Sequence, residues 1–367
     1  MSRPRTRDDL ALMDGYHSPQ VQVEVRLNTN EAPEPPPAAF TEALAAAVGD
    51  VAWHRYPDRA AGALRARIAE VEGAAVPGGL GAANVLAANG SNEVLQTVLL
   101  AYGGPGRTAA VFEPTYALHR HIAGLTGTGV LDVDRDDGFA LRLDATLDAI
   151  DGARPSVVFL CSPNNPTGMV EDRATVEALL DAVEAVDGLL VVDEAYGQFA
   201  PFSSLELVDE SRSLVVSRTY SKTWSAAALR LGYLVGPTWA VADLEQVVLP
   251  YHLDALTQTA GLLALDHLDA MTDRVARLTA ERDRVVAGLD ALGVHQWPSG
   301  ANFVLFRPGA ADRAAGDAVW QGLVDRSVLV RNCSSWPRLE GCLRVTIGTP
   351  AENDRFLGAL AEVLAGT

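Results

Sequence analysis

The chain offers one side-chain amine, because of its 29 lysine and arginine residues all but Lys222 are arginine. Lys222 stands in Thr219-Tyr220-Ser221-Lys222-Thr223-Trp224, just past an apolar run and eight residues before Arg230. A poised amine can form an imine with an aldehyde cofactor, while nearby hydroxyls and an arginine fork suit a phosphate group. A lone lysine usually lies at the surface, so the prediction that Lys222 forms such an imine depends on the residues around it.

An acid and a phenol follow a second apolar run, in Val191-Val192-Asp193-Glu194-Ala195-Tyr196-Gly197. Open α/β sheets place their ligands at such strand ends. A carboxylate at Asp193 would keep a pyridine nitrogen protonated and make the ring an electron sink. The ordinary alternative is that Asp193 caps a turn. Tyr196, three residues later, could reach the phenolic oxygen of the same ring.

Two further segments follow apolar runs in the same way. In Cys161-Ser162-Pro163-Asn164-Asn165-Pro166-Thr167-Gly168 the prolines fix a turn that presents Asn165 as a neutral amide. In Ala88-Asn89-Gly90-Ser91-Asn92-Glu93 a strand passes through Gly90 into a helix start, whose free N–H groups and dipole can hold a phosphate. Taken singly, these segments are an ordinary loop and an N-cap.

The elements that must position these residues alternate between apolar runs and helical stretches from about residue 50 to 250, which predicts an α/β fold with a largely parallel sheet. We expect an irregular N-terminal arm over residues 1–40, a large domain over 41–255 and a small α+β domain over 256–367. A long helical stretch from Thr257 to Leu292 connects the domains, and a helix begins near Pro350.

Composition excludes several classes of function. No apolar run approaches the roughly 18 to 20 residues of a membrane-spanning helix, and no secretory signal is recognisable. The net charge of −18 disfavours nucleic acid as a partner. The three cysteines form no C-x-x-C pair and are expected to be reduced, structural thiols in a cytoplasmic protein. His119 and His121 lack metal-site spacing and are expected at the surface, so we predict no metal.

The motifs GSNE, SPNNPTG, VVDEAYG, TYSKTW and LRLGY occur in this order and resemble the successive motifs of fold-type I pyridoxal-5′-phosphate (PLP) aminotransferases, class II subgroup. With LNTNEAP, HRYPD, EPTY, LPYHL, ANFVLF and CLRVTIGT, the sequence is similar to the histidinol-phosphate aminotransferase family from about Gly15 to Leu357. The resemblance implies a seven-stranded, mostly parallel sheet flanked by helices, plus a smaller C-terminal domain.

Carried over position by position, the resemblance implies Lys222 as the Schiff-base lysine and as the base that moves the substrate proton. Asp193 would pair with the pyridine nitrogen, Asn165 and Tyr196 would bind the phenolic oxygen, and Tyr116 would stack on the ring. The residues implied for the cofactor phosphate are Ser91, Asn92, Ser221, Arg230 and, more weakly, Thr219. Tyr56 in HRYPD would reach the phosphate in the neighbouring subunit, which implies a homodimer with shared active sites.

For the substrate, Arg331 and Arg344 match the family's two anion-binding arginines, and Tyr16 matches its arm tyrosine. Two arginines suit a phosphate monoester, and either can take a carboxylate when glutamate is the donor. The sequence departs from the family at Ala32 in Asn30-Glu31-Ala32-Pro33 and in the linker NCSSWPRLEG, where Trp336 and Arg338 replace shorter polar residues. These departures concern the substrate and leave the cofactor chemistry intact.

The leading hypothesis is therefore transamination between L-histidinol phosphate and 2-oxoglutarate, giving imidazole-acetol phosphate and glutamate, in histidine biosynthesis. The altered linker keeps open a paralogous aminotransferase for aromatic amino acids or another ketone. A PLP-dependent phospho-amino-acid decarboxylase is a further alternative. A PLP-binding regulator without enzymatic activity is disfavoured by the acidic charge.

Overall fold

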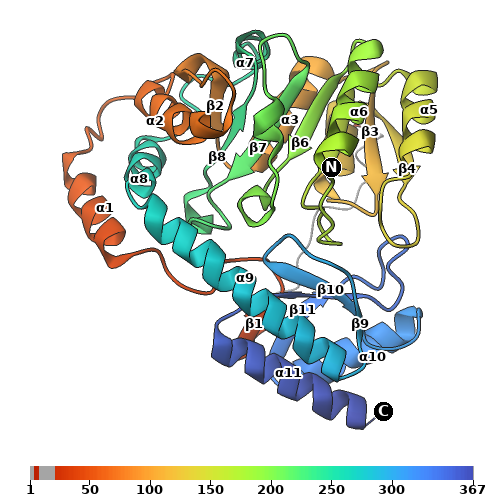
Figure 1. Ribbon diagram of the computed structural model, residues 1–367. Helices are drawn as coiled ribbons and strands as arrows, with labels where there is room; N and C mark the ends of the chain where they lie inside the picture. Colours follow the sequence, from red (N-terminus) through yellow and green to blue (C-terminus); the bar gives the residue numbers. More distant parts are fainter. Residues whose placement is uncertain (1–3, 8–20, 367) are drawn as a thin grey trace.

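The computed structural model describes residues 4–7 and 21–366, whose elements form two sheets with their own helices (Figure 1). The larger sheet has seven strands in the order β2-β8-β7-β6-β5-β3-β4. Their bounds are β2 Val85–Ala88, β3 Thr108–Glu113, β4 Gly129–Asp134, β5 Val157–Cys161, β6 Leu189–Asp193, β7 Leu214–Thr219 and β8 Gly232–Val235. Only β8 runs antiparallel to its neighbours. The predicted α/β class, with a mostly parallel seven-stranded sheet, is confirmed.

Helices cover both faces of this sheet, because successive side chains of a buried strand point to opposite sides. Val192 packs on one side of β6 and Val191 on the other. The helices that contribute to the first side are α2 Gly62–Glu72, α5 Leu143–Ala153, α6 Arg173–Ala185 and α8 Ala255–Leu265. The second side holds α3 Ser91–Tyr102, α4 Leu118–Thr126 and α7 Thr238–Glu245.

The smaller sheet has five strands in the order β1-β11-β12-β10-β9. Their bounds are β1 Val25–Leu27, β9 His295–Gln296, β10 Phe303–Arg307, β11 Val328–Asn332 and β12 Leu343–Thr346. Three helices share its core, α9 Leu268–Ala291, α10 Arg313–Val324 and α11 Pro350–Ala365. The sheet is antiparallel except where β1 pairs in parallel with β11.

Strand β1 differs from the irregular arm expected up to residue 40. Val25 and Leu27 are buried in the smaller sheet's core while Arg26 between them is exposed. Three residues are too short a period-two run to distinguish from a loop in the sequence, and the pairing partner lies about 300 residues away. The arm segment therefore connects the N-terminal region to the C-terminal sheet.

The helical stretch expected from Thr257 to Leu292 is divided into α8 and α9. Asp254 caps α8, its side chain accepting from the Thr257 backbone N–H. The break falls at Asp266 and His267, and His267 adopts non-helical backbone angles with its ring edge-on to Phe40. Phe40 lies on α1 (Ala38–Asp50). Beyond the break, α9 runs from the larger sheet to the smaller one (Figure 1).

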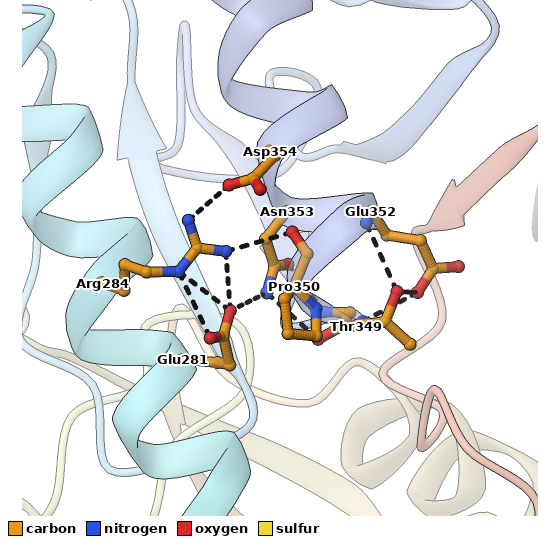
Figure 2. Close-up of polar contacts among 8 residues, drawn as sticks. Glu281, Arg284, Thr349, Pro350, Glu352, Asn353 and Asp354 are labelled. Atoms are coloured by element: carbon orange, nitrogen blue, oxygen red, sulfur yellow. Dashed lines mark hydrogen bonds and ion pairs between the residues drawn. The ribbon is translucent and has the colours of Figure 1, made fainter.

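A polar network joins the middle of α9 to the N-terminus of α11 (Figure 2). Arg284 Nη2 donates to Glu281 Oε2 at 2.8 Å and to the Pro350 carbonyl at 3.1 Å, and Nη1 donates to Asp354. Asn353 Nδ2 donates to the same Glu281 oxygen at 2.9 Å. The network fixes α11 against α9.

Within residues 4–7 and 21–366, no helix combines the length and apolarity needed to cross a membrane. Cys161, Cys333 and Cys342 are free and buried. Burial raises the pKa of the Cys333 thiol to about 12, so this group stays protonated at neutral pH.

Candidate active site

A cavity of about 440 Å³ lies where the carboxyl ends of the larger sheet's strands face the smaller sheet. Strands β5, β6 and β7 end at this edge because they run in parallel, and their final residues Cys161, Asp193 and Thr219 line the cavity. The sequence-predicted residues that line it are Ser91, Asn92, Tyr116, Asn165, Asp193, Tyr196, Thr219, Ser221, Lys222, Arg230, Arg331 and Arg344.

Two further sequence-predicted residues remain, Tyr56 and Tyr16. Tyr56 is 79% exposed and stacks on Tyr251, with ring centroids 4.5 Å apart. Tyr16 falls outside the described residues. The cavity therefore contains every other predicted cofactor and substrate residue.

The Lys222 amine lies just beyond the end of β7. Nζ donates a hydrogen bond to the Thr29 carbonyl at 3.1 Å. Burial, the positive charge of Arg344 and, more weakly, that of Arg230 lower the pKa of Lys222 from 10.5 to about 8, while Glu31 opposes this shift. An appreciable fraction of the amine is thus neutral near pH 8, as nucleophilic attack on a carbonyl requires.

Asp193 terminates β6 and is buried at the base of the cavity. Its Oδ1 accepts from the Ala195 backbone N–H at 3.1 Å, and its Oδ2 lies 3.0 Å from His119 Nε2. These contacts hold the carboxylate at the strand end without an arginine or lysine partner in the described ranges. A charged carboxylate in this position favours a cation in the adjacent cavity.

The prediction that His119 is a surface histidine is wrong. Its side chain is fully buried on α4 between Tyr116, which meets its ring edge-on, and Phe159, which stacks on it at 4.9 Å. The helical alternation of His119 and His121 indicated a solvent face, but His119 follows Tyr116 by three residues and so shares its side of the turn. That spacing is the signal the sequence offered.

An anion cradle is formed where the N-terminus of α3 meets the loop before β8. Gly90 has φ +81°, and a Cβ there would lie 2.8 Å from Nη2 of Arg230. A Cβ on Gly232 would lie 2.3 Å from the Ser91 nitrogen. The two glycines therefore leave room for the guanidinium of Arg230 and the backbone of Ser91 to converge, as a phosphate site at a helix N-terminus requires.

Hydroxyl groups complete the cradle. Thr219 Oγ1 donates to Ser221 Oγ at 3.0 Å and accepts from the Ser221 backbone N–H at 3.1 Å. Arg230 Nη1 reaches the same Ser221 hydroxyl at 3.5 Å. Arg230 itself has φ +51°, a left-handed conformation that aims its side chain back across the loop. The site presents a guanidinium, two hydroxyls and helix N–H groups to one point.

Aromatic and amide groups form the side walls. Tyr116 donates from its hydroxyl to Asn92 Oδ1 at 3.2 Å. Tyr196 accepts at its hydroxyl from Asn30 Nδ2 at 2.8 Å, and burial raises its pKa well above the usual tyrosine range. The phenol therefore remains a neutral donor. Asn165 uses Oδ1 to accept from Nη1 of Arg344, which leaves its amide nitrogen as the donor.

Arg331 and Arg344 enter the cavity from the smaller sheet as directly paired residues of β11 and β12. Their exposed fractions are 9% and 5%. Arg344 donates to Asn165 and to the Asn28 carbonyl, both neutral acceptors, and lies 5.0 Å above the Phe303 ring. Two buried guanidinium groups side by side provide a strong site for an anion.

The segment from Asn28 to Glu31 is part of the site although the sequence suggested no role for it beyond family likeness. Asn30 is buried with φ +55°, and its backbone N–H donates to Thr346 Oγ1 at 2.9 Å. Asn302 Nδ2 donates to the backbone carbonyl of Asn30 at 3.2 Å. In the sequence, the only indication of this role was an asparagine among turn-forming residues, because asparagine tolerates a left-handed backbone conformation. Since its side chain also donates to Tyr196, which follows β6, Asn30 connects the arm to both sheets.

The residues of this cavity fit pyridoxal phosphate. A reactive amine, a buried carboxylate and an anion cradle occupy three different walls, which matches the aldehyde, pyridine nitrogen and phosphate of that cofactor. A Cβ at Gly232 would clash with the backbone of Gly90 and Ser91, and a Cβ at Gly90 would have to displace the Arg230 guanidinium. The arginine pair lies apart from this cradle, on the smaller sheet, and leaves a second anion subsite for a substrate.

The family model for aminotransferase class I and II matches residues 23–360. A histidinol-phosphate aminotransferase of Frankia casuarinae is 46% identical over 367 residues, covering 98% of this chain and 90% of the relative. One from Mycolicibacterium smegmatis is 47% identical over 365 residues, covering 98% and 93%.

Solved structures share the fold. The histidinol-phosphate aminotransferase from Sinorhizobium meliloti, in complex with pyridoxal-5′-phosphate, matches with a TM-score of 0.89 at 22% identity, covering 100% of this chain and 99% of that chain. A putative aminotransferase from Burkholderia pseudomallei matches with a TM-score of 0.80 at 27% identity, covering 94% and 100%.

Proposed function

The chain belongs to the class I and II aminotransferase family, and from this premise we propose that it transfers the amino group between L-histidinol phosphate and 2-oxoglutarate in histidine biosynthesis. Its cofactor is pyridoxal 5′-phosphate. The observation that carries the substrate assignment is the buried pair Arg331 and Arg344, which adds a second anion site to the one for the cofactor. A substrate with its own phosphate suits that pair.

Pyridoxal phosphate, when bound, supplies an aldehyde that takes up the amino group and a ring that withdraws electrons from the substrate. Lys222 would hold the cofactor, since it is the only lysine of the chain. Once released by the incoming amine, its Nζ would accept the proton from the substrate Cα, and its lowered pKa suits a base near neutral pH. Asp193 would keep the pyridine nitrogen protonated.

The remaining residues would bind and orient. Tyr196 and the amide of Asn165 would donate to the phenolic oxygen, and Tyr116 would cover one face of the ring. The cradle residues proposed for the phosphate are Ser91, Asn92, Thr219, Ser221 and Arg230, which the geometry of the two glycines supports. Arg331 and Arg344 would hold the substrate anion, and Tyr16 is proposed as a further substrate-binding residue.

The assembly we propose is a homodimer with shared sites. Near the two ends of the larger domain's sequence, Trp53, Tyr56, Leu249 and Tyr251 are exposed large side chains, and Tyr56 and Tyr251 stack on each other. An exposed apolar group of this kind is typical of an interface. Tyr56 would extend from it to the cofactor phosphate of the neighbouring subunit.

The domain boundaries are proposed as expected from the sequence, with 41–255 as the large cofactor domain and 256–367 as the small one. The separate hydrophobic clusters around the two sheets support two domains, although α8 and the start of α9 pack in the cluster of the larger sheet and β1 packs in that of the smaller one. The cytoplasm is the proposed location, supported by three free, buried cysteines and the biosynthetic reaction.

The deciding experiment is a single half-reaction. L-histidinol phosphate is added to the PLP-loaded protein without a keto acid, and the cofactor absorbance is followed. Rapid conversion to the pyridoxamine spectrum supports the proposal. Conversion by glutamate or phenylalanine but not by histidinol phosphate would keep the aminotransferase activity and reject this substrate.

A further inference from the structure

The linker between the two substrate-site arginines, Asn332 to Gly341, is folded into consecutive turns. Its turns follow each other closely, with the Trp336 N–H donating to the Cys333 carbonyl at 2.9 Å and the Leu339 N–H donating to the Trp336 carbonyl at 3.1 Å. The Cys333 N–H bonds the Cys342 carbonyl at 3.1 Å and closes the linker at its base. These bonds define the turn from which the Trp336 side chain extends.

The linker is also anchored to the larger domain. Arg338 donates from Nη1 to the Arg135 carbonyl and from Nη2 to Asp137 Oδ1 at 3.3 Å. Trp336 packs beside a cluster that contains Phe139 of the same large-domain loop and Leu339 of the linker. These contacts hold one edge of the indole, while another part of Trp336 lines the cavity.

Within the cavity, the indole supports an arginine. The guanidinium carbon of Arg331 lies 5.2 Å from the ring centroid of Trp336, a cation–π distance. Arg344, directly opposite on the next strand, lies over Phe303 in the same manner. Like charges on paired positions repel each other. Aromatic faces on both sides favour keeping the two cations in place together.

We propose that Trp336 is the positioning residue that makes this subsite prefer a dianionic phosphate monoester over a carboxylate, by holding Arg331 beside Arg344. A phosphate monoester near pH 7 carries nearly two negative charges and three acceptor oxygens, so it engages two guanidinium groups at once. A single carboxylate is satisfied by one guanidinium fork. The inference rests on the proposed function, since it assumes that a substrate anion enters between these arginines.

The test compares two unreactive ligands, an imidazole on a short alkyl chain that ends in either phosphate or carboxylate. Each is titrated calorimetrically into PLP-loaded wild-type protein and into Trp336→Leu and Trp336→Phe variants. Trp336→Leu is expected to weaken binding of the phosphate ligand on the order of tenfold and to leave binding of the carboxylate ligand within about twofold. The reason is that only the phosphate ligand needs both Arg331 and Arg344. Trp336→Phe keeps an aromatic face and should restore most of the preference.

A matched control is Trp297→Leu. Trp297 belongs to the same cluster and lies under Arg307 at 5.1 Å, yet it does not line the cavity. This variant should lower the melting temperature while keeping the wild-type ratio of phosphate to carboxylate affinity. In turnover, Trp336→Leu should raise KM for the phosphate substrate and leave kcat near wild type.

An unchanged affinity ratio in Trp336→Leu, or an equal fall in Trp297→Leu, would overturn the inference and reduce Trp336 to a packing role. The proposed function fails in a different way. In that case the wild-type protein binds the phosphate ligand with the expected preference but does not react with histidinol phosphate.

Discussion

His119 Nε2 lies 3.0 Å from Asp193 Oδ2, and both side chains are buried. Among the described residues, Nδ1 of His119 has no hydrogen-bond partner, and a proton on Nε2 satisfies the contact with Asp193. The imidazole therefore donates to the carboxylate. Together with the Ala195 N–H, it orients Asp193 toward the position proposed for the pyridine nitrogen.

Replacing His119 with phenylalanine is expected to weaken cofactor binding on the order of tenfold, because the buried carboxylate loses a hydrogen bond to a charged group. His119→Gln, which keeps an N–H donor, should recover part of the loss. PLP affinity is measured by equilibrium titration of the cofactor-free protein. His121→Phe on the same helix is the control, since His121 is only half-buried and the hydrogen bond to Asp193 is made by His119. Equal losses in the His119 and His121 variants would contradict the role.

The rate at which PLP attaches to the cofactor-free protein is expected to rise with pH around a midpoint of about 8, the lowered pKa of Lys222. The neutral amine is the nucleophile, and burial with Arg344 and Arg230 favours it. Because Glu31 favours the charged form, Glu31→Gln should move the midpoint lower. Stopped-flow absorbance measures the rate, and a midpoint near the ordinary value of 10.5 would reject the assignment.

The same shift affects stability. Between pH 8 and 10.5 the unfolded chain binds more protons at Lys222 than the folded chain, so the free energy of unfolding of the cofactor-free protein rises with pH across this window. Lys222→Met should remove this contribution. Denaturant titrations at both ends of the window measure how much the free energy of unfolding of each protein changes with pH.

Gly90→Ala is expected to reduce PLP affinity, because the new Cβ would lie 2.8 Å from the Arg230 guanidinium and displace it from the cradle. The positive φ adds backbone strain of about 1 kcal/mol. Gly106→Ala is the matched control, since Gly106 has φ +83° but a Cβ added there would meet only open space. Both variants should lose stability, and only Gly90→Ala should lose cofactor affinity. Calorimetry on the cofactor-free proteins separates the two effects.

The sequence predicted the cavity residues that follow strands, because the carboxyl ends of parallel strands meet at one edge whatever their distance in sequence. Lys222, Asp193 and Asn165 come together for this reason. His119 could not be predicted in the same way, since its partner Asp193 lies 74 residues away and helical periodicity alone does not identify which side of α4 is covered. The only local indication that His119 is buried was its spacing of three residues from Tyr116.

Long-range contacts made by backbone atoms also could not be predicted from the sequence. Thr29 accepts from Lys222 through its carbonyl, at a separation of 193 residues, so its side-chain type carries no signal. The pairing of β1 with β11 likewise depends on where the arm runs in space. Side-chain patterns predicted the elements, whereas long-range backbone pairings required the structure.

The cap of α11 should contribute measurably to stability. Thr349 accepts from the Glu352 backbone N–H, and Glu352 in turn accepts from the Thr349 N–H at 2.8 Å, which forms a capping box (Figure 2). Thr349→Ala is expected to lower the free energy of unfolding by about 1 kcal/mol. Gly358→Ala in the same helix, where a Cβ meets nothing within 4 Å, should raise it by about 0.5–1 kcal/mol. Urea denaturation of both variants tests whether the free energy of unfolding changes in opposite directions.

The proposed sharing of sites between subunits predicts complementation between two defective chains. Lys222→Ala cannot attach the cofactor but carries an intact Tyr56, whereas Tyr56→Ala keeps Lys222 and loses the phenol that would reach the partner's phosphate. Loss of that phosphate contact should weaken PLP binding on the order of tenfold. In a mixed dimer, the Lys222 of one chain and the Tyr56 of the other restore one complete site.

Mixing the two variants under subunit exchange, at a PLP concentration too low for Tyr56→Ala alone, should therefore recover transaminase activity. The control mixes Tyr56→Ala with the double variant Lys222→Ala, Tyr56→Ala, in which the mixed dimer has no intact pair and activity should stay low. Native mass spectrometry verifies that mixed dimers form in both samples. If mixed dimers form without recovery, each site is completed within its own chain, and the exposed Tyr56 and Tyr251 pair serves only the interface.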